Sequence, residues 1–429
     1  MAAPDTEYTM EQVLEELNLS NESRLIELDD IPYVVLINGI VSPILVGVTL
    51  LTNICVCLVL VRPNMRSATN TLLVAMAVSD TLTGICPLPA YFRFFSGGDE
   101  AHLEWVPYQW CAAFYFLTDH LPTIFHTASV WLTVALAAQR YVYVCHAIDA
   151  RRWCTIENSL RAVAVIYVVA VLYQLCRRAL PALPLCFTSS AAVLYQLCRF
   201  VEMRYTPVQL PSRIDQTGNT TVVGCIGEFW PILVPYVDAY FNTYYWFRVI
   251  AVHLVPCSAL VALNAALVMA MRRAQARHRQ LVAQNRKSES RRLAESNLTT
   301  MMLVAVVGVF LVVEFPLAVI FIIVIVENTW TLTIIEPDRM ATASLFVNLF
   351  ILLSYPLNFF IYCGMSRQFR GTLCDLLHCR APEASSVSTA AMSTAARLRG
   401  ETTRYIEMAP AINDTQDSVR STPICRDNV

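Results

Sequence analysis

The residues of this chain that could do chemistry lie inside or at the ends of long apolar segments. One such segment ends in the triplet Gln139-Arg140-Tyr141, and carboxylates at Asp80 and Glu314 lie within two others. A charge carried to the middle of a bilayer costs roughly 2.5–3.5 kcal/mol, so charged groups in membrane helices face the bundle interior or the interface and usually serve a function. These positions predict polar side chains that face the interior of a helix bundle, with a charged triplet at the membrane edge.

The composition indicates that most of the chain lies in lipid. Of 429 residues 56% are hydrophobic and 15% charged, and the mean hydropathy is +0.50. Apolar runs long enough to cross about 30 Å of hydrocarbon as helices lie near 34–61, 69–95, 111–138, 160–176, 240–271, 298–326 and 340–363. The predicted fold is an all-α membrane protein with a seven-transmembrane-helix bundle.

The charges of the connecting loops predict the orientation. Basic residues gather in the odd-numbered loops, at Arg62 and Arg66, at Arg151 and Arg152, and between Arg272 and Arg292. Loops rich in Arg and Lys face the cytoplasm. The segment 1–32 carries nine acidic residues against Arg24 alone, and it lacks the basic and apolar regions of a cleaved signal peptide. We therefore expect a multi-pass plasma-membrane protein with an extracellular acidic tail at 1–32.

The positions of the glycosylation sequons agree with this orientation. Asn18, Asn21 and Asn219 fall on the expected outer side, and we predict that they are glycosylated. Asn297 and Asn413 also match the sequon but face the expected cytoplasmic side, so they should stay unmodified.

Three motifs resemble those of the rhodopsin-like G-protein-coupled receptors. The triplet resembles Asp/Glu-Arg-Tyr, with Gln139 in place of the acid. Phe310 and Pro316 match the Phe-x-x-Cys-Trp-x-Pro hinge of the sixth helix. Glu314 stands where that hinge usually has a tryptophan, and a carboxylate at this depth is costly. We expect Glu314 to be kept neutral by desolvation or to pair with His126 of the third helix.

In the seventh helix, Asn358 to Tyr362 stand in for Asn-Pro-x-x-Tyr, with Phe359 in the proline position and the proline moved to Pro356. The resemblance assigns the switch and G-protein coupling to Gln139, Arg140, Tyr141, Asn358 and Tyr362, and the hinge to Phe310, Glu314 and Pro316. It assigns an inner polar network to Asn53 and Asp80, where a sodium ion commonly binds. An aspartate held by neighbouring Ser or Asn side chains without an ion is the alternative.

The segments VYVCHA, VFLVVEFP and SYPLNFFIYCGMSRQFR together look like the insect sex peptide receptors, which also respond to myoinhibitory peptides (allatostatin B). The resemblance covers roughly residues 33 to 375, apart from a repeated segment. It implies coupling to heterotrimeric G proteins of the Gi/o class and activation by short peptides with paired tryptophans and an amidated C-terminus. Because Gln139 replaces an acid, Arg140 lacks its usual charge-assisted bond, so we expect measurable basal signalling.

The expected ligand pocket needs aromatic surface and a few polar acceptors. Residues that could provide these are Asp119, His120, His126, Glu314, Tyr240 and Tyr244. The tyrosines are equally well placed to form an ordinary aromatic belt at the membrane interface.

Two of the fifteen cysteines are expected to pair. Most cysteines lie in apolar helices, where a thiol is a small hydrophobe. Cys111 and Cys225 both face the expected oxidising side and can form a disulfide, the alternative being two free thiols. The 29 residues from Cys111 to Arg140 are about one turn more than the usual rhodopsin-like spacing. A kink or bulge at Pro122 is expected to absorb the difference.

Other functions find little support in the sequence. The only lysine, Lys287, lies in a cytoplasmic loop, which excludes a retinal pigment. Pro122 stands where amine receptors place an aspartate, although Asp119 is one turn away. No nucleotide loop, HExxH or catalytic triad is present, so we expect no enzyme, no cofactor and no nucleic-acid partner. A seven-helix channel or transporter is the alternative, but transporters usually contain repeated halves, which are not visible here.

The string AVLYQLCR occurs at 170–177 and again at 192–199. We interpret 170–199 as containing a 22-residue tandem insertion, either genuine or an error of gene prediction or splicing, within a transmembrane domain of 33–365.

The C-terminal part is expected to serve membrane contact and regulation. Residues 366–379 predict a short amphipathic eighth helix on the inner leaflet of the bilayer, with Cys374 and Cys379 as palmitoylation sites or unmodified thiols. The polar tail 380–429 is expected to be disordered. Its cluster of Ser and Thr residues suits receptor kinases and arrestin.

Overall fold

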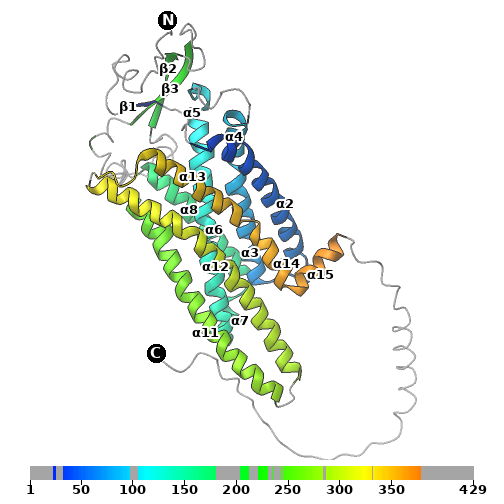
Figure 1. Ribbon diagram of the computed structural model, residues 1–429. Coiled ribbons are helices and arrows are strands. Elements are labelled where there is room, and N and C mark those ends of the chain that lie inside the picture. Colours follow the sequence, from blue (N-terminus) through cyan, green and yellow to red (C-terminus); the bar gives the residue numbers. More distant parts are fainter. Residues whose placement is uncertain are drawn as a thin grey trace, which may run out of the picture.

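The computed structural model describes residues 23–25, 32–96, 105–179, 203–211, 221–229, 235, 243, 245–283, 287–330 and 332–377. Within these ranges, seven helical segments are long and apolar enough to cross a membrane: Val35–Leu60, Ala68–Phe94, Tyr108–Cys145, Ile156–Gln174, Tyr245–Ala276, Thr300–Glu327 and Asp338–Met365. They form one elongated bundle (Figure 1). The predicted seven-helix architecture is confirmed.

Several spans consist of more than one helical element. The first is π-helix η1 (Val35–Val41) followed by α2 (Ser42–Leu60), and the second is α3 (Ala68–Ile85) with α4 (Leu88–Phe94). The third is α5 (Tyr108–Tyr115), π-helix η2 (Phe116–His120) and α6 (Leu121–Cys145). The short α7 (Ala147–Trp153) leads to α8 (Ile156–Ala179). The remaining elements are π-helix η5 (Val249–Leu254), α11 (Val255–Ala283), α12 (Lys287–Trp330), α13 (Pro337–Ser354), α14 (Leu357–Met365) and α15 (Arg367–Leu376).

The third span lies at the centre of the bundle and the fourth at its rim. Half of the most apolar part of the third span is buried, against 11% for the fourth. Val165, Val168 and Leu172 of α8 are each at least half exposed. In a membrane helix such apolar side chains face lipid, so their exposure needs no further partner.

Each π-helical segment in the described residues ends two positions before a proline. Pro43, Pro122 and Pro256 are the second residues of α2, α6 and α11. A proline donates no backbone hydrogen bond and its ring clashes with the preceding turn, so the helix before it can widen into a π turn. The expected bulge near Pro122 is therefore present as η2, which takes up part of the extra length between Cys111 and Arg140.

Pro356 and Pro316, the prolines of the seventh and sixth spans, affect their helices differently. The seventh span breaks at Tyr355-Pro356, between α13 and α14. Helix α12 continues through Pro316 without an interruption.

A three-stranded antiparallel sheet lies at one end of the bundle, called the sheet end from here on (Figure 1). Its order is β1 (Ser23–Leu25), β3 (Thr221–Phe229) and β2 (Met203–Pro211), with Met203 opposite Phe229 and Pro211 opposite Thr221. The all-α fold predicted from the sequence did not include this sheet. The β-branched residues that begin β3 were the available strand signal.

Helix α15 lies at the opposite end of the bundle, called the α15 end. It spans Arg367–Leu376, and its contact with a membrane stays a prediction. The first copy of AVLYQLCR forms part of α8, and the second lies outside the described residues. The interpretation of 170–199 as an insertion and the other domain boundaries stay predictions.

Candidate functional site

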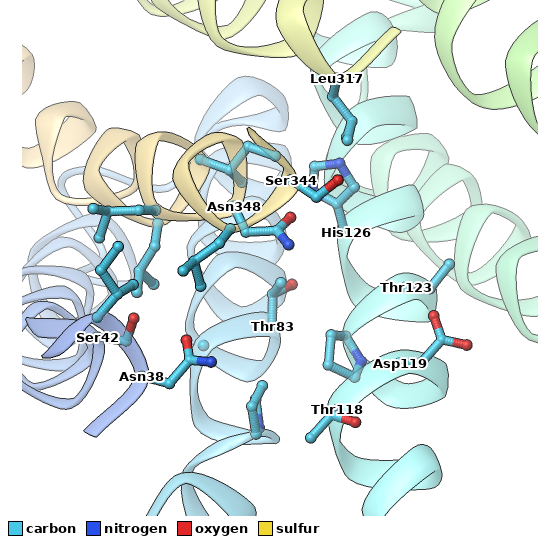
Figure 2. Close-up of a pocket in the computed structure, with 18 of the residues that line it drawn as sticks. Asn38, Ser42, Thr83, Thr118, Asp119, Thr123, His126, Leu317, Ser344 and Asn348 are labelled. Carbon is cyan, nitrogen blue, oxygen red and sulfur yellow. The ribbon is translucent and has the colours of Figure 1, made fainter. Parts of the chain in front are cut away.

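A cavity of about 340 Å³ is lined by residues from the half of the bundle nearer the sheet end, such as Asn38, Tyr91 and Thr118. Its walls come from η1, α2, α3, η2, α6, α12, α13 and the residues before η5 (Figure 2). Its polar lining includes Asn38, Ser42, Thr83, Thr118, Asp119, Thr123, His126, Tyr245, Arg248, Ser344 and Asn348. We call it the main cavity. Its volume is that of an ordinary small-ligand site, so it can hold a few side chains of a peptide.

The π turns place polar side chains at this cavity. Asn38 belongs to η1, and Thr118 and Asp119 belong to η2. The third π turn, η5, carries His253 close to the cavity floor. Because π turns change which side chains a helix directs inward, they recur at functional sites. Here the prolines of three spans serve to build one site.

Beside the main cavity lies a group of three ionisable side chains, His126, His253 and Glu314, which we call the buried cluster. His126 Nε2 lies 3.2 Å from Glu314 Oε1, and His253 Nδ1 lies 3.4 Å from Glu314 Oε2. The side chains of Glu314 and His253 are 2% and 1% exposed. The cluster thus joins the third, fifth and sixth spans. The expected proximity of Glu314 and His126 is present, whereas His253 was missed.

The side chains of the buried cluster lie close together, but their polar atoms are poorly aligned for hydrogen bonding. The distances are those of ion pairs, yet Glu314 Oε2, His126 Nε2 and both ring nitrogens of His253 make no hydrogen bond of good geometry within the described part of the chain. A buried polar group without an aligned bond is costly, and the same groups become stabilising when they align. A small rotation of either imidazole can therefore change the energy of this cluster.

His126 connects the main cavity to the interior. It lines both the main cavity and a small cavity of about 20 Å³ deeper in the bundle, and its Nδ1 lies 3.4 Å from the Tyr355 hydroxyl. Glu314 lines only the small cavity of these two. Sequence analysis assigned Glu314 to the ligand pocket, but the structure places it one layer deeper, behind His126.

A cation also lines the main cavity. The Arg248 guanidinium lies 4.3 Å from the centre of the Phe321 ring, and the His253 ring stacks on the same phenylalanine at 5.2 Å. Stacking on an aromatic face stabilises a desolvated guanidinium. Sequence analysis missed Arg248, although an arginine inside the apolar segment WFRVIAVHLV was a usable signal.

The small cavity contains the expected inner aspartate. Ser129 Oγ donates a 2.5 Å hydrogen bond to Asp80 Oδ1, and Asn358, Thr133 and Phe310 also line the cavity. Its volume is that of about one water molecule. One carboxylate with hydroxyl and amide oxygens is a donor set that suits a hard cation such as sodium.

Asn53, the other predicted member of this network, stabilises α3 without bonding Asp80. Its Nδ2 donates to the Ala77 carbonyl at 3.1 Å and to Thr81 Oγ1 at 3.0 Å. These bonds fix the first span against the turn of α3 that carries Asp80.

At the α15 end, the triplet is held by neutral contacts. Gln139 Nε2 donates to Ser159 Oγ of α8 at 2.9 Å, while the Arg140 guanidinium lies 5.8 Å from the Tyr143 ring centre. Across the described residues, Arg140 forms no ion pair, and its Nε is buried without a hydrogen-bond partner. Tyr141 lies beside His146, with ring centres 5.8 Å apart. Below the triplet, burial raises the pKa of the Cys154 thiol, an effect that Arg140 opposes.

Tyr362 is 2% exposed and packs on Phe369 of α15, with ring centres 5.7 Å apart. Its hydroxyl has no hydrogen-bond partner within the described residues. Asn358 lies in the small cavity, one helical turn away. The two predicted switch residues therefore face different surroundings in this conformation.

The expected disulfide joins Cys111 of α5 to Cys225 of β3, with the Cα atoms 6.6 Å apart. Tyr205 of β2 stacks on Tyr115 of α5 at 6.3 Å. The sheet is thus attached to the third span at the sheet end. The prediction of this disulfide is confirmed.

The remaining predicted residues are only partly placed. Asp119 lines the main cavity and lies 3.4 Å from His120, which does not line it. Cys374 is exposed on α15. Tyr240, Tyr244, the sequons at Asn18, Asn21 and Asn219, and Cys379 lie outside the described residues.

Comparisons with known proteins agree with this geometry. Residues 52–181 match the seven-transmembrane receptor domain of the rhodopsin family, and residues 232–380 match the serpentine chemoreceptor domain Srw. The chain is 38% identical to the sex peptide receptor of Drosophila melanogaster over 346 residues, 80% of this chain and 73% of that protein.

Two further relatives match over most of the chain. Sex peptide receptor-related protein 2 of Caenorhabditis elegans is 33% identical over 395 residues, 91% of this chain and 78% of that protein. The FMRFamide receptor of Drosophila melanogaster is 27% identical over 337 residues, 76% of this chain and 51% of that protein.

Proposed function

Because this chain belongs to the rhodopsin-like G-protein-coupled receptors, in the group of the sex peptide receptor, we propose that it responds to an amidated neuropeptide of the myoinhibitory or sex-peptide type. Its relatives include receptors for sex peptide and for FMRFamide, and members of this receptor family are not enzymes. The resemblance of its motifs supports coupling to Gi/o. The loop charges support an extracellular N-terminus.

The observation that carries this proposal is the position of His126. Its side chain lines the main cavity and lies 3.2 Å from Glu314, which is two residues before Pro316 in α12. A ligand that contacts His126 changes the pairing of Glu314 with His126 and His253. The ligand would then bind one helix packing more tightly than the other, and this difference in affinity is what shifts a conformational equilibrium.

The hinge carries the change toward the α15 end. A proline inside a helix removes one backbone hydrogen bond, so α12 bends there at low cost. Movement of the part of α12 before Pro316 opens the surface around Arg140 to the G protein, and rearrangement of Asn358 and Tyr362 accompanies it. When sodium is bound, Asp80, Ser129 and Asn358 would hold it and stabilise the resting packing.

A peptide panel tests this function. Cells that express the full chain receive synthetic amidated peptides with paired tryptophans, and FMRFamide-type peptides as a second class. Promiscuous and Gi-selective readouts are recorded, with pertussis toxin as the control for Gi/o. A response to the first class that the toxin removes supports the proposal. The absence of a response to both peptide classes overturns it.

Glycosidase treatment tests the orientation. A mobility shift that becomes smaller in Asn18→Gln together with Asn21→Gln, with the contribution of Asn219 left in place, puts the N-terminus outside, as the loop charges favour. The absence of glycan on both, with an intracellular N-terminal tag, would favour the channel alternative. Receptor kinases and arrestin acting on the 380–429 tail, and palmitoylation at Cys374 and Cys379, remain part of the proposal.

A further inference from the structure

Two asparagine side chains line the main cavity from spans that are far apart in the sequence. Asn38 comes from η1 and Asn348 from α13, on the side of the cavity across from Asp119 and His126 of the third span (Figure 2). Neither amide group hydrogen-bonds to another residue in the described part of the chain. Asn348 is exposed although it lines a cavity, so its amide faces the cavity space.

The other polar residues on this side are neutral hydroxyls, Ser42, Thr83 and Ser344. Thr83 already donates to the Ser79 carbonyl at 2.9 Å. The five residues, Asn38, Ser42, Thr83, Ser344 and Asn348, are called the amide wall. The carboxylate, the imidazole and the guanidinium that line the cavity, from Asp119, His126 and Arg248, belong to the third and fifth spans.

The amide wall suits one kind of chain end. A carboxamide presents an acceptor oxygen and an NH₂ donor, and an asparagine side chain presents the complementary pair. A free carboxylate only accepts, so it can bond the NH₂ groups and hydroxyls of the wall but leaves the asparagine oxygens without a donor. It would also bury its charge beside a wall that has no cation, which is costly.

We propose that the amide wall binds the C-terminal carboxamide of the peptide ligand, and that Asn38 and Asn348 set the preference for amidated over free-acid peptides. This inference rests on the proposed function, because it names the part of that site which recognises the ligand's end. The same geometry leaves His126, Asp119 and Arg248 to contact the rest of the peptide.

The test compares two forms of one probe, a synthetic peptide with paired tryptophans made with a C-terminal carboxamide or with a free carboxylate. Dose–response curves for both are recorded on the full chain and on Asn38→Ala and Asn348→Ala. Loss of one neutral hydrogen bond should lower the potency of the amide form roughly two- to tenfold. The acid form should change little, so the amide-to-acid potency ratio contracts. Surface level is measured with an N-terminal tag.

Two further variants make the result decisive. Asn348→Lys adds a cation to the amide wall and should raise the potency of the acid form while lowering that of the amide form. Asp119→Asn, on the opposite wall, should change both forms by the same factor.

The outcomes separate this inference from the proposed function. If neither peptide form activates the unmodified chain, the proposed function fails and the inference falls with it. If the amide form activates but its ratio to the acid form is unchanged in Asn38→Ala and Asn348→Ala, only the inference is overturned. A ratio that collapses in Asp119→Asn alone places the carboxamide on the opposite wall and also overturns it.

Discussion

The two ends of the bundle hold their charged side chains in different ways. Near the sheet end, the carboxylate of Glu314 lies between two imidazoles, His126 and His253, in surroundings that are almost fully buried. At the α15 end, Arg140 has an aromatic neighbour in Tyr143, and the adjacent Gln139 bonds Ser159 instead of the arginine. One end is held by ionisable groups that depend on one another, and the other by neutral contacts.

This difference indicates how strongly each end of the bundle should respond to a mutation or a ligand. Removing one partner from a buried ionic group is strongly destabilising, because the remaining group is left buried and unpaired. A neutral hydrogen bond contributes only about 0.5–1.5 kcal/mol. The sheet end should therefore respond steeply to mutation and ligand, and the α15 end should pass easily between packings.

Loss of the disulfide should have the largest effect on the sheet end. Cys111→Ser with Cys225→Ser releases the sheet from the third span, at a cost of about 2–4 kcal/mol in stability. We expect a lower surface level and a lower midpoint of thermal unfolding in detergent. Cys257→Ser, at a free cysteine, is the control and should be near normal. Equal stability of the two variants would mean that the sheet is not a stabilising part of the site.

Glu314→Ala should weaken the response to peptide more than any change at the α15 end. It leaves both imidazoles without their carboxylate, and each unsatisfied buried partner costs about 1–3 kcal/mol, or roughly five- to 150-fold in potency. Potency is measured by dose–response at matched surface levels. Glu157→Ala, at an exposed acid paired with Arg161, is the control and should be neutral. Normal potency in Glu314→Ala would exclude the buried cluster from the coupling path.

Gln139→Glu should make the α15 end more like the sheet end. The new carboxylate gives Arg140 an ionic partner, worth about 1 kcal/mol because both side chains are only half-buried. Basal signalling should fall roughly fivefold with surface expression retained. Ser159→Ala, which removes only the neutral bond to Gln139, is the control. A basal level that Gln139→Glu leaves unchanged would show that Arg140 is restrained by something other than its missing acid.

Deletion of residues 170–191 should have the smallest effect, because it leaves both ends unchanged. The deletion joins Val169 to the second AVLYQLCR copy, so identical residues replace those of the first. Gln196 would take the place of Gln174, whose Nε2 donates to the His120 carbonyl at 3.4 Å, and Tyr195 that of Tyr173, which stacks on Phe247. Surface level and peptide response should survive or improve. Loss of delivery only in the deleted form would show that the segment is structural.

Much of the framework could be predicted from the sequence, because its causes are local. Twenty-odd consecutive apolar residues specify a membrane helix wherever they occur. Pro122 and the long spacing from Cys111 to Arg140 predicted the bulge that appears as η2. The cost of a carboxylate in lipid was enough to single out Glu314 and to suggest His126 as its neighbour.

The rest of the site depends on how the helices are rotated and packed, which the sequence does not state. Hydropathy places His253 and Arg248 in the fifth span, but only packing brings them onto Phe321 and, for His253, beside Glu314. The depth of Glu314 behind His126 likewise depends on where the third and sixth spans touch. Asn38 and Asn348 are more than 300 positions apart, and nothing along the chain relates them until the first and seventh spans line one cavity. The sequence determines which side chains each span carries, but the rotation and packing of distant helices decide which of those side chains face one another.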